Sequence, residues 1–198
     1  MRTFLKATSE DELSALWVLI ATTGLRRGEA LGLGWSDLDL DAGRAQINQT
    51  VIAIGWNIHF GQPKTQAGRR PIALDPSTVQ VLREHQLAML SRPAPADVGN
   101  VEGQLVFCGP DGAPHHPERV YQAFRRAVIR HRLPSIPLHG LRHTWATLAL
   151  QADVHPRVVQ ERLGHSNIAI TLQTYSHVLP IMHDNAAVTV AALFMPMQ

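Results

Sequence analysis

Apolar residues recur at helical spacing over much of the chain. The first such run is Leu13, Leu16, Trp17 and Ile20. The capping-box pattern Ser9-x-x-Glu12 precedes this run and Gly24 follows it, so we predict a helix that ends at the glycine. The same reasoning predicts further helices at residues 27–33, 75–90, 117–132, 138–151, 155–163, 167–175 and 185–194.

Residues 44–74 show a different pattern, in which β-branched residues are frequent. Apolar runs at 45–54, 58–60 and 72–74 are separated by turn residues at 55–57 and 65–68. This pattern predicts a three-stranded antiparallel meander with Lys64 close to its second turn, and residues 105–108 predict one more short strand. We therefore expect an α+β fold that is mainly α-helical, with a small three-stranded antiparallel sheet, in a single domain over residues 1–198.

The composition is that of an ordinary globular protein. The 198 residues are 45% hydrophobic and 17% charged, which supplies a core and argues against disorder. The one cysteine, Cys108, excludes a disulfide framework and a cysteine-based zinc cluster. The N-terminus lacks the apolar run of a secretory signal, and no apolar stretch reaches the length of about 18 residues that a membrane span needs. We therefore expect a cytoplasmic protein with no membrane partner.

Positive charge is concentrated in two segments, although the net charge is only +2. One segment contains no acid and holds Arg119, Arg125, Arg126, Arg130, Arg132 and Arg142. The other, also without an acid, holds Lys64, Arg69 and Arg70. Such segregation favours a surface that binds a polyanion. On charge alone, a solvated arginine-rich helix explains the pattern equally well.

Two motifs combine an arginine with a second polar residue. In T-G-L-R-R-G-E, Arg26 follows the helix-ending glycine, and Glu29 lies three positions on, where it can brace the guanidinium. In L-H-G-L-R-H-T-W, His139 and Arg142 share one face of a helix. A separate apolar stripe is expected to face the core: Leu138, Leu141, Trp145 and Leu148. Taken alone, a routine ion pair and a capping histidine are the simpler explanations.

Two further motifs are also weak when taken alone. In L-G-H-S, His165 directly follows a glycine that is expected to cap a helix, and Tyr175 lies ten residues later. A helix-end histidine and a core tyrosine would account for both. His139 and His143 are four positions apart, as in a zinc motif. The glutamate of H-E-x-x-H is missing, however, and Arg142 would repel a cation, so we expect no metal site.

Taken together and in this order, the motifs resemble the catalytic domain of the tyrosine recombinases, the phage integrase family. The resemblance extends from about Ser9 to His177 and is closest in LHGLRHTWATLAL and ERLGHSNIAITLQTYSHV. It implies a catalytic set of Arg26, Lys64, His139, Arg142, His165 and Tyr175, with Glu29 supporting the first arginine. The arginines that we expect to contact DNA are Arg69, Arg70, Arg125 and Arg126.

The resemblance implies that the protein cuts and rejoins double-stranded DNA through a 3′-phosphotyrosyl link to Tyr175, without metal, ATP or another cofactor. The residue types suit this chemistry, because preorganised donors such as arginine stabilise the extra charge of the transition state by ~3–4 kcal/mol each. His139 is the expected proton acceptor and Lys64 the expected acid for the leaving 5′ oxygen. We also expect neighbouring arginine charge to lower the pKa of Tyr175.

The family usually carries an N-terminal helical domain that grips the other side of the DNA. The catalytic pattern begins so close to Met1 that we expect this core-binding domain to be absent. Residues 178–198 are expected to form a tail helix that packs either in cis or on a neighbouring protomer. The expected partners are duplex DNA and other protomers, as a tetramer on DNA and a weak oligomer or monomer without it.

Three other functions are compatible with parts of this sequence pattern. A type IB topoisomerase-like enzyme would use the same chemistry, but the short chain and the H-x-L-R-H wording favour a recombinase. A noncatalytic DNA-binding regulator or decoy would keep the fold without the reaction. A metallohydrolase that uses the 11 histidines would lose its activity in a chelator.

Overall fold

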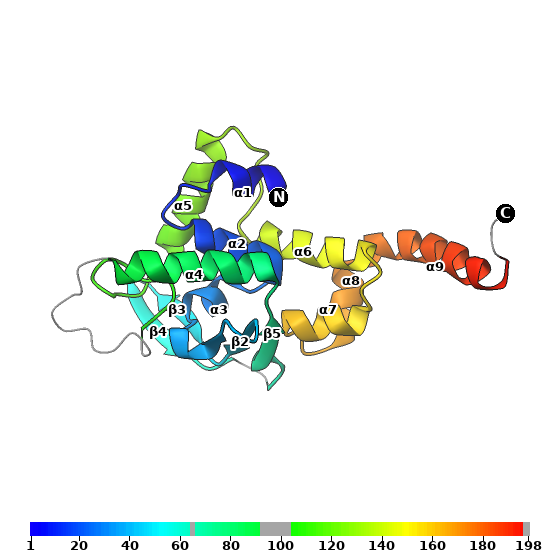
Figure 1. Cartoon of the computed structure of the whole chain (residues 1–198), viewed down its shortest axis with the longest axis horizontal. Coiled ribbons are helices and arrows are strands. Elements are labelled where there is room, and N and C mark those ends of the chain that lie inside the picture. The colour runs from blue at the N-terminus through cyan, green and yellow to red at the C-terminus, as the bar shows by residue number, and fades with distance from the viewer. Residues whose placement is uncertain (64–65, 92–103, 196–198) are drawn as a thin grey trace.

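The computed structural model describes residues 1–63, 66–91 and 104–195. Its helices are α1 (Arg2–Ala7), α2 (Ser14–Thr23), α3 (Arg27–Leu31), α4 (Pro76–Leu90), α5 (Pro117–Arg130), α6 (His139–Gln151), α7 (Pro156–Leu163), α8 (Ile168–Thr174) and α9 (Leu179–Phe194). Its strands are β1 (Leu38–Asp39), β2 (Arg44–Ile47), β3 (Thr50–Ile54), β4 (Asn57–Gly61) and β5 (Arg70–Ala73). The mainly helical α+β fold is confirmed (Figure 1).

Helix α2 lies at the centre of the fold and packs against α1, α3, α4 and α6. It is apolar on all sides and almost wholly buried, as a core helix should be. It ends at Gly24, which adopts the left-handed conformation with φ 71°. The predicted capping box is wrong, because α2 begins at Ser14 without a side-chain cap. The Ser9 hydroxyl, in the turn after α1, donates to Glu10 instead.

The predicted meander is wrong in its strand pairing. Strands β1, β2 and β5 form an antiparallel sheet in the order β1-β2-β5, whereas β3 and β4 form a separate hairpin. The chain leaves the first sheet between β2 and β3, where the side chain of Asn48 donates to Asp37 and that of Gln49 donates to the Gly32 carbonyl. The strand expected at 105–108 is also wrong, since only isolated bridges occur there, at Leu105 and Cys108.

Within the part of the chain that the structure describes, the buried apolar residues form two clusters. The larger cluster draws on α1, α2, α3, β2, β3, β5, α4, α5 and the start of α6. The smaller cluster is Ala146, Leu150, Val159, Leu163, Tyr175 and Val178, from α6, α7 and the α8 region. The apolar stripe expected on α6 is only partly confirmed, because Leu148 is 53% exposed. The two clusters meet where α2 and β5 contact α6 and α7.

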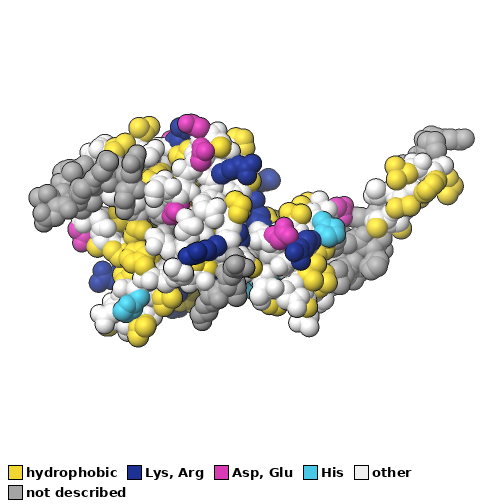
Figure 2. Space-filling view, turned by 90° about the horizontal axis from the view of Figure 1, so that it is seen from below, with side chains coloured by type: hydrophobic (Ala, Val, Ile, Leu, Met, Phe, Trp, Pro, Cys, Tyr) yellow, Lys and Arg dark blue, Asp and Glu magenta, His cyan; other side chains and the backbone are white. Residues whose placement is uncertain are grey.

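Helix α9 extends away from the rest of the molecule as an arm (Figure 1). It begins at Leu179, within the expected tail segment 178–198 but before the apolar run at 185–194 that predicts a helix. Residues 186–195 are exposed, and their apolar side chains lie open on the arm (Figure 2). Among the described residues, no helix combines the length and apolarity that crossing a membrane requires.

Candidate active site

Arg26 is placed by the break between α2 and α3. Gly24 turns the chain, and Arg26 becomes the N-cap of α3 in extended conformation. Its backbone N–H donates to Oε2 of Glu29 at 3.0 Å and its Nη1 to Oε1 at 2.8 Å. Its Nη2 donates to the carbonyl of Gly164 at 3.3 Å. These bonds hold the guanidinium in place. Because the side chain is 43% exposed, the guanidinium is still open to a ligand.

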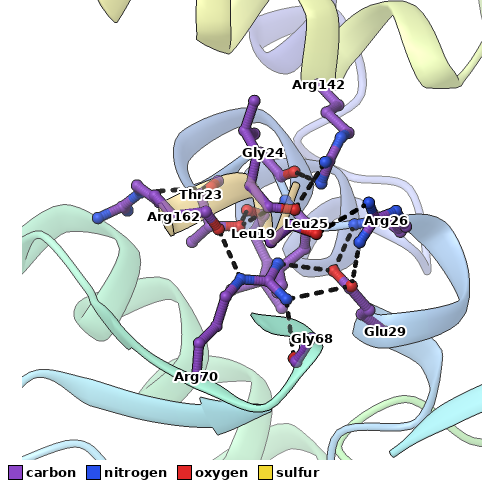
Figure 3. Close-up of polar contacts among 12 residues, drawn as sticks. Leu19, Thr23, Gly24, Leu25, Arg26, Glu29, Gly68, Arg70, Arg142 and Arg162 are labelled. Carbon is purple, nitrogen blue, oxygen red and sulfur yellow. Dashed lines mark hydrogen bonds and ion pairs between the residues drawn. The ribbon is translucent and has the colours of Figure 1, made fainter. Parts of the chain in front are cut away.

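Arg70 supports the same carboxylate from the interior. Its Nη2 donates to Oε2 of Glu29 at 2.9 Å and its Nη1 to Oε1 at 3.2 Å (Figure 3). Burial acts to raise the pKa of Glu29, but the hydrogen bonds and charges of Arg70 and Arg26 outweigh it, so the pKa lies below its ordinary value. Arg70 is only 6% exposed, which corrects the expectation that it lies on the DNA-facing surface.

Arg142 is buried on α6 and is held by two backbone carbonyls. Its Nη1 donates to Gly24 and its Nη2 to Leu163, both at 2.7 Å. These carbonyls lie at the C-terminal ends of α2 and α7, where free carbonyls carry partial negative charge. Burial and the charge of Arg26 lower the pKa of Arg142 to about 9, which leaves it protonated at neutral pH.

Three arginines therefore converge on the end of α7. The carbonyls of residues 162–164 accept in turn from Arg70 at 2.7 Å, from Arg142 at 2.7 Å and from Arg26 at 3.3 Å. Arg162 points the other way and donates to carbonyls of residues 22, 23 and 73, as Figure 3 shows for Thr23. Arg26 and Arg142, the two candidates for binding phosphate, thus donate to carbonyls of adjacent residues at one helix end.

His165 follows the left-handed Gly164 that ends α7. Its Nδ1 lies 2.9 Å from Oγ1 of Thr171, which fixes the ring. The ring lines a cavity of ≈ 550 Å³ together with Arg26 and Glu29. Burial and the charges of Arg142, Arg26 and Arg70 lower the pKa of His165 to about 4. The imidazole is therefore neutral in the free protein at neutral pH.

His139 is the first residue of α6. It lines a second cavity, of ≈ 370 Å³, with Arg26 and Arg142. Its ring contacts the ring of His143, with centroids 4.6 Å apart. Desolvation, the neighbouring His143 and the charges of the two arginines lower the pKa of His139 to about 4. Arg26 borders both cavities and so joins the two histidines into one site.

Tyr175 lies at the C-terminal end of α8, with its ring in the smaller cluster and only 2% exposed. Its hydroxyl lies 3.0 Å from Nδ1 of His143. Burial raises the pKa of Tyr175 above its ordinary value, although the charge of Arg142 acts to lower it. This corrects the expected direction, because loss of solvent outweighs the arginine.

The structure thus gathers Arg26, His139, Arg142 and His165 around one cationic site, with Tyr175 next to it through His143. Lys64 lies outside the described residues, so its role stays a prediction. Three of the arginines expected at DNA are exposed: Arg69, Arg125 and Arg126. Within residues 1–63, 66–91 and 104–195, no group of three His, Cys, Asp or Glu side chains is placed to hold a metal ion.

Two residues that support the site are not predicted from the sequence. His143 enters the sequence prediction only as a zinc ligand, yet it contacts the tyrosine hydroxyl, and its position one residue after Arg142 is the available signal. Arg162 links the end of α7 to α2 and lies 5.0 Å from the ring of Trp145. No pattern in the sequence distinguishes Arg162 from an ordinary arginine at a helix end.

A neutral histidine pair, two fixed guanidinium groups and an adjacent phenol have the chemistry that suits a single phosphate group. Comparison with known proteins agrees, since residues 1–180 match the phage integrase family. The chain belongs to this family.

Two curated relatives illustrate the match. The chain is 31% identical to a tyrosine recombinase XerC-like protein of Caldanaerobacter subterraneus subsp. tengcongensis, over 96% of this chain and 51% of the relative. It is 27% identical to the prophage integrase IntR of Escherichia coli, over 91% of this chain and 46% of the relative. The chain therefore spans about half the length of these curated relatives.

Solved structures show the same fold. The Tn1549 transposon integrase in complex with transposon right end DNA superposes with a TM-score of 0.77 at 26% identity, covering 88% of this chain and 58% of that chain. The catalytic domain of bacteriophage HP1 integrase gives a TM-score of 0.60 at 21% identity, covering 100% of this chain and 94% of that chain. The second likeness concerns the fold alone.

Proposed function

We propose that this chain is the catalytic part of a site-specific DNA recombinase that cuts and rejoins double-stranded DNA through Tyr175. The observation that supports this most directly is the convergence of Arg26 and Arg142 on one helix end, between His139 and His165. The Tn1549 relative was solved with transposon DNA, which agrees with a DNA substrate.

The arginines would bind the two non-bridging oxygens of the scissile phosphate. Arg26 is exposed enough to do so directly. Arg142 donates one N–H to each of two carbonyls. Because a guanidinium has five N–H donors, others remain for a phosphate oxygen. With Nδ1 of His165 on Thr171, its Nε2 is the nitrogen left for a phosphate oxygen. These donors would stabilise the charge that develops in the transition state.

The tyrosine oxygen would attack phosphorus while the bond from phosphorus to the 5′ oxygen breaks. In the tautomer protonated on Nε2, Nδ1 of His143 accepts the tyrosine proton, with His139 in ring contact behind it. The 5′ oxygen takes a proton from an acid, for which Lys64 is our prediction. Rejoining reverses these transfers, and because one phosphodiester bond replaces another, it needs no ATP.

The test is covalent capture on a nicked duplex, from which a short 5′ product diffuses away. The wild-type protein should form a DNA adduct in EDTA, and Tyr175→Phe should form none. Tyr121→Phe is the matched control variant, because Tyr121 is the only other tyrosine in the sequence and lines the same cavity as His139. An adduct that survives Tyr175→Phe, or a wild-type protein that binds DNA without forming one, would contradict the proposal.

The second outcome would support a noncatalytic DNA-binding regulator instead. One relative at 30% identity is a "putative defective protein IntQ" of Escherichia coli, and its printed name describes that protein as defective. The two functions differ in one measurement, since a regulator binds duplex DNA and leaves every phosphodiester intact.

We also propose that protomers assemble on DNA through α9. Its apolar side chains are exposed, Leu193 and Phe194 to 78% each, and they have the chemistry of a protein contact. Replacing both with aspartate should remove the larger complexes on DNA in a native gel and leave single-protomer complexes. Larger complexes that persist in this variant would contradict the assignment.

A further inference from the structure

Arg70 lies behind the site and contacts both groups that hold Arg26. The first group is Glu29, whose two oxygens each accept from Arg70 and also from Arg26. The second is the end of α7, where Nε of Arg70 donates to the carbonyl of Arg162 at 2.7 Å. The two neighbouring anchors of Arg26 are therefore set by one buried side chain.

The packing around Gly164 shows how closely Arg70 fits the helix end. A Cβ atom on Gly164 would lie 2.6 Å from Nη1 and 2.8 Å from Cζ of Arg70. The carbonyl of this same glycine accepts from Arg26. A side chain at position 164 would therefore displace Arg70, the carbonyl that holds Arg26, or both.

The charges of Glu29, Arg26 and Arg70 also support a role for Arg70 in the site. Glu29 is one carboxylate shared by two guanidinium groups, so the cluster has a net charge of +1. If Arg70 were absent, Glu29 and Arg26 would form a neutral pair, and less positive charge would remain for a phosphate. Arg70 therefore compensates the carboxylate from the interior and leaves the charge of Arg26 available.

We propose that Arg70 is a positioning residue, which acts through Glu29 and the end of α7 to hold the Arg26 guanidinium in the orientation that binds the scissile phosphate. The kinetic consequence rests on the proposed function. In this role Arg70 does not contact DNA, because, unlike Arg142, it lines neither cavity of the site, and its Nε, Nη1 and Nη2 atoms all donate to protein acceptors.

The kinetic test compares Arg70→Met with Arg83→Met. Arg83 is also paired with a carboxylate, Asp41, but on the surface of α4. At saturating nicked duplex, Arg70→Met should form the Tyr175 adduct about a hundredfold more slowly, as expected for a small misplacement of a group in the site, with DNA affinity unchanged. Arg83→Met should match the wild type. Arg70→Lys, which keeps the charge but cannot span both anchors, should also be slow.

A double variant separates positioning from a general loss of structure. In an Arg26→Lys background, Arg70→Met should cause no further loss of rate, because the residue through which it acts has already been changed. If the loss persists in that background, or if Arg70→Met cleaves at the wild-type rate, the proposal is wrong.

A second readout does not depend on cleavage. The Nε–H signal of Arg26 in ¹⁵N NMR should show a rigid side chain in the wild type and a mobile one in Arg70→Met, with the Arg142 signal unchanged. An Arg26 signal that stays rigid would overturn the proposal even if the wild-type protein formed no adduct. Absence of the wild-type adduct alone would overturn the proposed function and leave this measurement to decide the role of Arg70.

Discussion

The two hydrophobic clusters differ in size and in what they contribute to the site. The larger cluster spans most of the elements, whereas the smaller one has six buried members among the described side chains, of which one is Tyr175. Arg26 and Glu29 belong to the part built on the larger cluster, and His165 and Tyr175 to the part built on the smaller one. The site lies where the two parts meet, so its geometry depends on their relative position.

The junction is joined by arginines that donate to backbone carbonyls. Helices α2 and α7 both end there, which leaves carbonyls without helical partners. Arg26, Arg70, Arg142 and Arg162 satisfy several of them. Such contacts are directional, so they fix the two parts in register as well as holding them together. The residues that bind phosphate in our proposal are therefore also residues that assemble the site.

The largest effect is expected when Arg142 is changed to lysine. An ammonium group cannot bond both carbonyls in the fork geometry of a guanidinium, so one helix end is left unsatisfied and one phosphate donor is misplaced. We expect adduct formation to slow about 10²- to 10³-fold, measured as single-turnover capture on nicked DNA. The protein should also lose about 1–3 kcal/mol of unfolding free energy, measured by urea denaturation.

The matched control is Arg157→Lys, at an exposed i,i+4 pair with Glu161 on α7. This pair contributes only a few tenths of a kcal/mol, so rate and stability should stay at the wild-type values. If Arg142→Lys behaved like this control, the junction would not depend on its arginine fork.

The next effect compares a leucine from each cluster. Leu31→Ala and Leu163→Ala both empty a fully buried site, at a cost of about 2–5 kcal/mol each. Because the smaller cluster has few buried members, we expect Leu163→Ala to open α7 and α8 locally. Hydrogen–deuterium exchange should then rise in these two helices while α2 keeps its protection, whereas Leu31→Ala should raise exchange throughout the chain.

Equal exchange patterns in the two variants would contradict the idea that the smaller cluster opens on its own. Leu82→Ala offers a further check, because Leu82 is fully buried in the larger cluster but lies on α4, away from the site. Its pattern should resemble that of Leu31→Ala.

A smaller effect is expected from alanine at Gly164. Both Gly164 and Gly55 have positive φ, of 64° and 60°, so alanine strains the backbone at either position by about 1–2 kcal/mol. A Cβ on Gly55 meets nothing within 4 Å, whereas on Gly164 it meets Arg70. Gly164→Ala should therefore lower the melting temperature more than Gly55→Ala, and only Gly164→Ala should slow adduct formation.

Equal melting temperatures in the two glycine variants would show that Arg70 moves aside at little cost. An equal loss of cleavage rate in both variants would show that the rate reports general strain and not the contact at the site.

The sequence predicts the fold and most of the site, for identifiable reasons. Helices such as α5 and α7 have a periodic apolar pattern, and Gly24 and Gly164 end helices because glycine adopts a left-handed backbone without steric cost. Strand pairing is less local, so the division between β2 and β3 depends on the side-chain bonds of Asn48 and Gln49, which no periodicity reveals.

Burial of charged groups is equally hard to predict. Arg69 and Arg70 are adjacent arginines that the sequence alone does not distinguish. Arg69 is exposed, whereas Arg70 is enclosed by Glu29 and α7. Likewise, Tyr175 is near Arg142, but the sign of its pKa shift depends on how much solvent the smaller cluster removes. Both outcomes follow from packing between segments far apart in the chain.

The last prediction concerns pH and joins both parts through His139 and His165, whose pKa values are lowered to about 4 from an ordinary value of 6.5. In the unfolded chain these imidazoles take up protons as the pH falls through 6.5, whereas the folded protein excludes them until about pH 4. The unfolded state therefore binds more protons in this window, and folding stability should decrease as the pH falls from 6.5 to 4. Above the window both forms are neutral, so the two histidines add no slope.

His165→Gln should flatten the decrease in melting temperature, because one of the two groups is removed. His139→Gln should also raise the pKa of His165 in an NMR titration, since His139 is one of the groups that lower it. An unchanged pKa for His165 would mean that the two imidazoles, one from each part of the molecule, do not share a site.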